Sequence, residues 1–463
     1  MDRRQKLVLV VAILASFVPF LDGSIVNVAL PSISEEVGGG LVTEQWVLDG
    51  YLLSLSALIL VAGSLSDLFG RSRVLAAGLI LFGIASVLCA LAPTSGILIV
   101  ARVLQGVGGA LLVPSSLALI TSNFEGALRS RAIGLWTGWT GIAFIAGPVF
   151  GGALVQFLGW RWIFGINVVP IAVTLLLLHR ITGREPQGTP APGARRPRID
   201  VIGAILGSLG LAAPVFALIE HQRLGWTHPA VLISLIGGII VFVAYLLWER
   251  RAPAPMLPLA LFSVRNFAVG NIATAFIYGA LSLAPLVVTL YLQRVVGAAP
   301  FLAGLASLPS AIIPLLLSGT FGALAGRYGP RWFMAAGPAI AASGTLWLLF
   351  VGEPFDFWTQ MLPGLLLLGL GLTMTVAPLT AAVLGAISSA QSGIASAVNN
   401  AVSRVAGLIA VAFLGALVAG ELDVESFHRV MIVAAALLLI GAAVSAVGIS
   451  NTAKPAAIAV PSA

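Results

Sequence analysis

The sequence is poor in charge, in lysine and in cysteine. Only 9 % of its 463 residues are charged, whereas an ordinary soluble domain carries about 25 %, so the chain lacks the polar surface that a water-soluble protein needs. Its single cysteine, Cys89, has no partner for an internal disulfide. Neither of its two lysines, Lys6 and Lys454, follows a glycine, which excludes a P-loop nucleotide site. A soluble enzyme, a disordered chain and a secreted scaffold are all disfavoured.

The sequence also lacks the local patterns of several enzyme classes. It contains no G-x-S-x-G, G-x-G-x-x-G or H-E-x-x-H motif. Its arginines are spread over many segments, so the net charge of +7 gives no reason to expect nucleic acid as a partner. We therefore expect no enzymatic activity, no metal and no cofactor. The four histidines are scattered without the spacing of metal ligands; they are His179, His221, His228 and His428.

Long apolar runs are abundant, and 59 % of the residues are hydrophobic. A membrane-spanning helix needs about 20 mostly apolar residues, and fourteen segments reach that length. The first one follows a basic start, MDRRQK, but its apolar stretch is longer than that of a secretory signal, so we expect it to stay as a helix. The predicted spans are residues 7–29, 44–64, 74–92, 97–121, 131–156, 160–180, 200–220, 229–249, 266–292, 300–325, 330–351, 358–384, 391–419 and 428–449.

Basic residues predict the orientation of these spans, because Lys and Arg in short loops stay on the cytoplasmic side. With the N-terminus inside, 18 of the 24 basic residues fall in cytoplasmic segments. An even number of spans then places both termini in the cytoplasm. The sequence thus predicts a multi-pass membrane protein, and its composition, rich in Ala, Gly, Arg and Pro and poor in Lys, favours a high-GC bacterium and hence the bacterial cytoplasmic membrane.

Two polar seams divide the chain. The longer one is rich in Pro, Gly and Arg, a composition that suits a flexible linker. The seams bracket two additional spans and leave six spans on either side. The predicted units are an N-terminal six-helix bundle (1–180), a cytoplasmic linker (181–199), two additional helices (200–249), a second cytoplasmic linker (250–265), a C-terminal six-helix bundle (266–450) and a cytoplasmic tail (451–463).

The two six-span halves repeat each other weakly. Between its second and third spans the first half contains GSLSDLFGRSR, and the corresponding segment of the second half is GALAGRYGPR. The glycines of the two segments match, but Asp67 is replaced by Gly326. A six-plus-six repeat with a binding site between the halves is typical of transporters.

Several motifs occur in a fixed order along the chain. They are LDGSIVNVALP (Leu21–Pro31), WVLDGYLL, GSLSDLFGRSR, ARVLQGVGGA, GIAFIAGPVFGG (Gly141–Gly152) and GWRWIFGINVVP. On these motifs, and over about residues 7–450, the chain resembles the major facilitator superfamily and, within it, the fourteen-helix drug:proton antiporter family. The resemblance implies an all-α membrane protein with two six-helix bundles plus two extra helices, fourteen transmembrane helices in all.

Four charged residues are predicted at membrane depth: Asp22, Asp49, Arg102 and Arg404. The first three share one depth, within about a turn of helix, and charged groups in a membrane usually face the bundle interior, where they pair or titrate. We expect Asp22 to carry a proton, Asp49 to be a second carrier or a cation contact, and Arg102 to regulate both. The alternatives are a fixed Asp22–Arg102 ion pair and, for Asp49, a solvated carboxylate near the outer interface. Gln105, one turn from Arg102, is either a packing residue or a substrate contact.

The segment between the second and third spans is a candidate gate. Gly63 and Gly70 allow it to turn tightly, and Arg71 and Arg73 keep it on the cytoplasmic side. Neither reason accounts for Asp67. The resemblance implies that this aspartate contacts the other half and stabilises the outward-facing state.

The fifth span carries a cluster of glycines around a proline. Gly147 and Gly151 are four residues apart, a spacing that lets helix backbones approach closely, and Pro148 introduces a bend. Plain helix packing explains part of this pattern. The resemblance implies that the motif, with Gly141 and Gly152, seals one end of the pathway and makes export the direction of transport.

The second half has no Asp or Glu in its predicted spans. Arg404 lies near the middle of the thirteenth span, beside Asn400, and either bonds backbone carbonyls or forms a polar wall of the substrate cavity. Tyr278 either lines that cavity or packs against neighbours. Family members that export dicationic drugs commonly carry extra acidic residues here, so the sequence does not favour a dication.

The sequence as a whole predicts a proton-coupled antiporter that exports lipophilic drugs or antibiotics by alternating access. Its expected partners are protons, a small lipophilic substrate and membrane lipid, and we expect it to act as a monomer. Three alternatives stay open: a dedicated exporter of an endogenous metabolite or lipid, an uncoupled facilitator of the same fold, and a membrane scaffold or sensor that does not transport.

Overall fold

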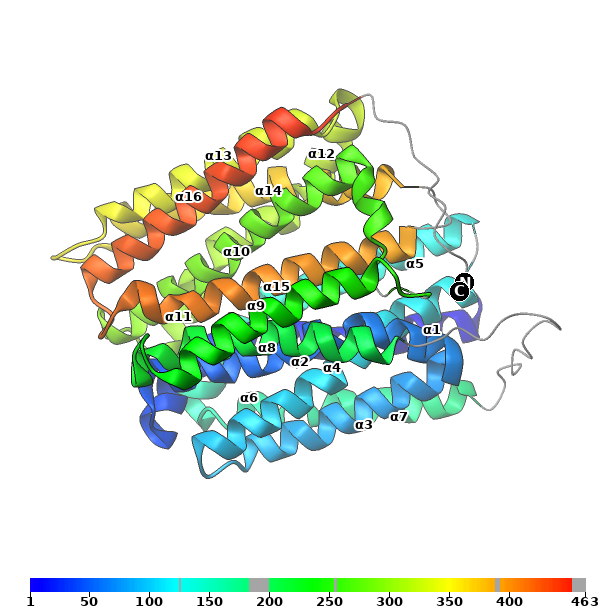
Figure 1. The fold of residues 1–463 in the computed structure, drawn as a ribbon, viewed down its shortest axis with the longest axis horizontal. Coiled ribbons are helices and arrows are strands. Elements are labelled where there is room, and N and C mark those ends of the chain that lie inside the picture. The colour runs from blue at the N-terminus through cyan, green and yellow to red at the C-terminus, as the bar shows by residue number, and fades with distance from the viewer. Residues whose placement is uncertain (125, 183–199, 254, 256, 388–391, 452–463) are drawn as a thin grey trace. The chain divides into compact units, whose positions relative to one another are not determined.

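A computed structural model describes the chain except for residues 125, 183–199, 254, 256, 388–391 and 452–463. The described residues are overwhelmingly α-helical, as the apolar runs predict (Figure 1). The helices are α1 (Arg3–Val37), α2 (Gly40–Phe69), α3 (Arg71–Ala90), α4 (Ser95–Asn123), α5 (Gly126–Leu158), α6 (Trp162–Gly165), α7 (Val168–Thr182), α8 (Val201–Leu224), α9 (Pro229–Glu249), η1 (Leu259–Ser263), α10 (Arg265–Arg294), α11 (Pro300–Ala306), α12 (Leu308–Tyr328), α13 (Arg331–Trp347), η2 (Leu348–Phe350), η3 (Phe357–Met361), α14 (Leu362–Gly385), α15 (Ser392–Val418) and α16 (Val424–Gly448).

The predicted membrane spans agree with these helices. Among the described residues, 13 segments are long and apolar enough to cross a membrane, and each overlaps one predicted span. The remaining predicted span, 44–64, lies inside α2, a helix of 30 residues in which several side chains are not described. The count of fourteen is therefore consistent with the structure.

Some helices differ from the predicted spans in length and continuity. The first helix has 35 residues because a capping box between Asp2 and Gln5 starts it before the apolar run. The sixth predicted span is two helices, α6 and α7, separated by Ile166 and Asn167. The tenth is likewise divided at Ser307 into α11 and α12. Hydropathy averaged over a window of mostly apolar residues does not detect such breaks.

The chain divides into two compact units. Unit 1 contains Met1–Ala212 and Gly237–Met256, and unit 2 contains Ala213–Ile236 and the described residues from Leu257 on. The two additional helices, α8 and α9, are each divided between the units. The boundaries of the predicted linkers stay predictions, because most of 181–199 lies outside the described residues.

Helix α4 is central to the packing of unit 1, where it contacts α1, α2, α3 and α5. Glycines make these approaches close: a Cβ on Gly106 would meet Tyr51 O of α2, and one on Gly108 would lie 2.7 Å from the Phe82 nitrogen of α3. Close backbone approach through small residues is the usual way in which membrane helices pack. The side chains of α4 are thereby held at fixed positions between α2 and α3.

Unit 2 uses the same means of packing. Its helices α13 and α14 lie against each other, and α10 contacts both α15 and α16. A Cβ on Gly344 would lie 2.6 Å from the Gly364 carbonyl oxygen, and one on Gly364 would lie 2.7 Å from the Gly344 carbonyl oxygen. The α13–α14 pair is thus packed backbone to backbone.

The segment predicted as an inner loop is almost entirely helical, which corrects that expectation. Helix α2 continues through Gly63 and Asp67 to Phe69, and Arg71 begins α3. Only Gly70 is outside a helix, with φ +93, a backbone conformation that side-chain-bearing residues rarely adopt. In unit 2, Gly329 follows α12 with φ +88, so the matched glycines of the sequence repeat have matched geometry.

Within unit 1, the additional helices α8 and α9 contact each other near the ends that the sequence places on the cytoplasmic side. The Trp248 indole Nε1 donates to both carboxylate oxygens of Asp200, each at 2.9 Å. Asp200 also accepts from the Gly203 backbone N–H at 2.8 Å. Further along, Gly210 lets α8 approach the Phe242 backbone of α9. This hydrogen-bonded contact fixes α9 to the start of α8.

Candidate functional site

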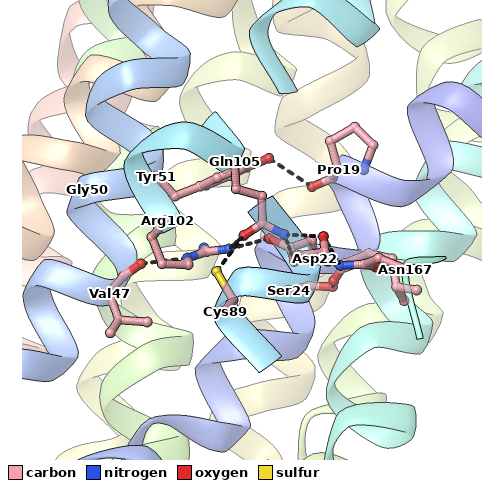
Figure 2. A network of polar contacts seen from close by, with 12 residues as sticks. Pro19, Asp22, Ser24, Val47, Gly50, Tyr51, Cys89, Arg102, Gln105 and Asn167 are labelled. Atoms are coloured by element: carbon pink, nitrogen blue, oxygen red, sulfur yellow. Dashed lines mark hydrogen bonds and ion pairs between the residues drawn. The ribbon is translucent and has the colours of Figure 1, made fainter. Parts of the chain in front are cut away.

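A buried ion pair lies in unit 1 between α1 and α4. Arg102 Nη1 is 2.6 Å from Asp22 Oδ2, and neither side chain is exposed. Figure 2 shows the Asp22 carboxylate at the centre of a polar network. The structure therefore brings these two predicted residues together.

Two amides complete the surroundings of Asp22. Gln105 Nε2 of α4 and Asn167 Nδ2 both donate to Asp22 Oδ1, each at 2.9 Å. Gln105 Nε2 also donates to the Ser86 hydroxyl at 2.9 Å, and its Oε1 accepts from Arg102 Nη1 at 2.5 Å. Gln105 is thus part of the network, and helices α1, α3 and α4 meet in it with the α6–α7 junction.

Arg102 is held by more than its ion pair. Its Nε donates to the Val47 carbonyl oxygen of α2 at 2.9 Å. The guanidinium lies over two aromatic rings, with its Cζ 4.4 Å from the centre of the Tyr51 ring and 5.6 Å from that of Phe164, distances within the range of cation–π attraction. Tyr51 is itself anchored by its hydroxyl, which donates to the Pro19 carbonyl oxygen. The arginine would keep its position if Asp22 lost its charge.

The energetics of this network follow from its burial. Taking an ion pair out of water is favourable only when further hydrogen bonds satisfy both charged groups. Asp22 has three donors, and Arg102 has two acceptors besides Asp22. Among the described residues, two polar atoms of the network have no hydrogen-bond partner, Arg102 Nη2 and Asn167 Oδ1. The charges are thus compensated, and unused bonding capacity remains at two points.

The glycine motif of α5 packs against α1 next to Asp22. A Cβ on Gly147 would collide with Ser24, and one on Gly151 would lie 2.6 Å from Ile25 Cγ1 and 2.9 Å from the Ile25 carbonyl oxygen. Pro148 lies inside the continuous helix. The other two residues of the predicted motif differ in exposure, since Gly152 is buried and Gly141 is exposed. The motif therefore fixes α5 against the turn of α1 that follows Asp22.

Asp49 is buried but does not join the network. It is 0 % exposed, and neither of its carboxylate oxygens has a hydrogen-bond partner among the described residues. The ring of Tyr51, two residues later, faces Arg102, and two residues turn a helix by about 200°. Asp49 therefore forms no hydrogen bond with Arg102, and both its regulation by Arg102 and its proton-carrying role stay predictions.

The gate predicted around Asp67 is described only in part. The side chain of Asp67 lies outside the described residues, as does the environment of Gly63. Arg71 and Arg73 lie in the first turn of α3, where Arg71 is partly exposed and Arg73 is exposed. Their gating role stays a prediction.

The candidate wall of unit 2 is formed by α10 and α15. Arg404 and Tyr278 are both partly buried, while Asn400 is exposed and donates to the Ser396 carbonyl oxygen at 2.9 Å. The neighbouring Asn399 joins the two helices, because its Nδ2 donates to Asn271 Oδ1 at 3.1 Å and to Thr274 Oγ1 at 2.9 Å. Asn399 therefore links α15 to α10 by two side-chain hydrogen bonds.

Sequence reasoning missed several members of the Asp22 network, among them Ser86, Tyr51 and Asn167. Asn167 had a usable signal, because it is an amide within the apolar run of GWRWIFGINVVP, and polar residues within a membrane span are usually functional. Ser86 and Tyr51 have no comparable signal. Among the described residues, no group of three or more His, Cys, Asp or Glu is arranged to hold a metal ion.

Comparisons with known proteins bear on this arrangement. The family model described as Major Facilitator Superfamily matches residues 12–270. The methylenomycin A resistance protein of Bacillus subtilis is 32 % identical, with 89 % of this chain and 87 % of that protein covered. The multidrug resistance protein Stp of Mycobacterium tuberculosis is 35 % identical over 91 % of this chain and 78 % of that protein. A crystal structure of a peptide transporter in complex with sulfate has a TM-score of 0.70 at 16 % identity, over 96 % of this chain and 94 % of that one.

Proposed function

The chain belongs to the major facilitator superfamily, and on this premise we propose that it exports small lipophilic drugs or antibiotics across the bacterial cytoplasmic membrane in exchange for protons. Two of its relatives are named for antibiotic or multidrug resistance, which supports export of this substrate class. It acts as a monomer by alternating access, with both termini in the cytoplasm, and has no enzymatic activity.

One observation carries the coupling: a single carboxylate, Asp22, joins α1 to α4 through a fully buried arginine. When Asp22 is ionised, its ion pair with Arg102 ties α1 to α4. When Asp22 binds a proton, the ion pair is lost and this tie weakens. A group whose protonation changes a helix contact can couple proton binding to a change between inward-facing and outward-facing states.

The remaining predicted residues have roles around this pair. Asp49, buried without a hydrogen-bond partner among the described residues, is a second proton carrier or a contact for a cationic substrate. Arg404, with Tyr278 and Asn400, forms the polar wall of the second half.

Two structural features support the conformational cycle. Gly147 and Gly151 contact α1 at Ser24 and Ile25, close to Asp22, which supports a role of the glycine motif in sealing one end of the pathway. Arg71 and Arg73 follow α2 after the single non-helical residue Gly70, so a movement of α2 is passed directly to α3. With Asp67, these arginines form the gate on the cytoplasmic side.

The test is proton exchange in proteoliposomes that contain the purified protein. A drug-susceptibility panel on expressing cells first identifies a transported drug, and an imposed pH gradient then drives its uptake. We expect the wild type to exchange drug for protons and Asp22→Asn to lose this exchange. Glu425→Gln, which neutralises an exposed acid paired with Arg429, is the matched control and retains it.

Two results would contradict the proposal. Proton exchange by Asp22→Asn at the wild-type rate would remove Asp22 from the coupling step. Drug movement that ignores the imposed pH gradient would indicate an uncoupled facilitator of the same fold.

A further inference from the structure

The surroundings of Asp22 fit its ionised form only. Arg102, Gln105 and Asn167 all donate to the carboxylate. A protonated carboxyl group has an O–H of its own, which needs an acceptor. As arranged, none of these three partners offers one, so protonation of Asp22 requires one of them to change.

Gln105 is not free to make this change. Its Oε1 accepts from Arg102 Nη1 and, at 3.7 Å, from the Cys89 thiol, while its Nε2 donates to Asp22 and to Ser86. Turning this amide over would set its NH₂ group against the Arg102 donor. Both sides of Gln105 are therefore fixed by their partners.

Asn167 differs from Gln105 on the side that faces away from Asp22. Its side chain is 0 % exposed, and its Oδ1 has no hydrogen-bond partner among the described residues. A buried polar atom without a partner is unusual and calls for an explanation. The orientation of the amide is therefore set on its other side, where Nδ2 donates to Asp22 at 2.9 Å and, more weakly, to the Ser86 hydroxyl at 3.5 Å.

We propose that Asn167 is a positioning residue that turns its amide over when Asp22 is protonated. Asp22 Oδ1 takes a proton from a hydronium ion, which leaves as water, and forms an O–H bond. The amide of Asn167 rotates half a turn about its Cβ–Cγ bond, and its Oδ1 replaces Nδ2 as the atom that faces Asp22. An O–H···O hydrogen bond thereby replaces the N–H···O bond, so the acid gains an acceptor for its proton although the ion pair with Arg102 is lost.

The other groups around Asp22 are compatible with this change. The charged group on α4 is Arg102. It keeps its hydrogen bond to the Val47 carbonyl oxygen and its contact with the Tyr51 ring when the ion pair is lost. From α3 the titratable group is Cys89, whose thiol bonds Gln105. Ser86, 3.5 Å from Asn167 Nδ2, can turn its own hydroxyl proton toward the amide oxygen after the rotation.

This inference rests on the proposed role of Asp22, and infrared spectroscopy tests it separately. The pH-induced difference spectrum is recorded on reconstituted protein with ¹⁵N-labelled asparagine. In the wild type we expect a carboxylic-acid C=O band that is absent in Asp22→Asn, together with an asparagine amide signal. In Asn167→Leu the amide signal is lost, and the C=O band moves to higher wavenumber because the acid has lost its acceptor.

Two further variants serve as controls. Asn266→Leu removes another buried asparagine, one that bonds the Ser450 backbone with both amide atoms, and should leave both signals unchanged. If Asn167→Leu does not fold, Asn167→Thr replaces it, since a hydroxyl can donate or accept: the asparagine signal should be lost while the C=O band stays near its wild-type position.

The outcomes separate the two proposals. A wild-type asparagine signal in Asn167→Leu or Asn167→Thr overturns the role of Asn167, even where Asp22→Asn abolishes proton exchange. Proton exchange that survives Asp22→Asn contradicts the proposed function instead, whatever the infrared spectrum of the Asn167 variants.

Discussion

The Asp22–Arg102 pair should show a large energetic coupling in a double-mutant cycle. The cycle compares Asp22→Asn, Arg102→Gln and the double variant with the wild type. Each single change leaves one buried charge without its partner, whereas the double change leaves two neutral amides. The free energy of unfolding should therefore fall by much less in the double variant than the two single losses added together.

The structure sets the magnitude. Removing one partner of a buried ion pair costs about 3–5 kcal/mol, and both side chains here are 0 % exposed with a 2.6 Å contact. The lower end of this range applies to the single variants. Arg102 keeps its hydrogen bond to the Val47 carbonyl oxygen when Asp22 is replaced, and Asp22 keeps two amide donors when Arg102 is replaced. We expect each single variant to lose about 3 kcal/mol and the double variant to lose about 3 instead of about 6, a coupling of about 3 kcal/mol.

The assay is reversible unfolding of the purified protein in mixed micelles, with the fraction of denaturing detergent as the variable. The exposed pair of Glu425 and Arg429 is the matched control, and its coupling should stay below about 1 kcal/mol. If the losses for Asp22→Asn and Arg102→Gln add to within about 0.5 kcal/mol, the pair is not formed in the folded protein and the reasoning is refuted.

Two other predictions concern packing and pH. Gly151→Ala places a Cβ 2.6 Å from Ile25 Cγ1 and should destabilise the protein by about 1–3 kcal/mol in the same assay, whereas Gly138→Ala, with nothing within 4 Å of the added Cβ, should change it by less than about 0.5 kcal/mol. The Ser426 backbone N–H donates to Asp423 at the start of α16 and lowers the pKa of that carboxyl below 3.8, so the cap stabilises the helix above about pH 4 and is lost as the pH falls further. Amide hydrogen exchange in the first turn of α16, corrected for its intrinsic pH dependence, should accelerate on acidification in the wild type and be fast at every pH in Asp423→Ala; equal protection in both would contradict this.

The sequence predicts how deep a residue lies in the membrane better than it predicts which neighbouring helix the residue faces. Counting residues from the ends of apolar runs places Asp22 and Arg102 in one layer, and the structure pairs them. The same counting places Asp49 in that layer, but Asp49 does not contact Arg102, because the face of α2 toward α4 is set by Gly106 and Tyr51. Packing of this kind depends on residues far apart in sequence, which a count along one span does not contain.

Breaks within an apolar run are also hard to predict. The interruption at Asn167 has apolar residues on both sides, so a hydropathy average passes over it, yet this turn is what brings the amide to Asp22. The opposite error occurs at the α2–α3 junction, where several glycines and charges predict a loop. Only Gly70 needs a left-handed conformation there, and the remaining residues continue the helices.

Cys89 gives the chain a natural chemical reporter. It is the sequence's only cysteine, and its thiol is buried against Gln105, one hydrogen bond away from both Asp22 and Arg102. The rate at which a membrane-permeant alkylating reagent reaches it therefore measures how often this layer opens. No engineered label and no cysteine-free background are needed. The wild-type chain can be followed through its transport cycle by the mass that alkylation of Cys89 adds.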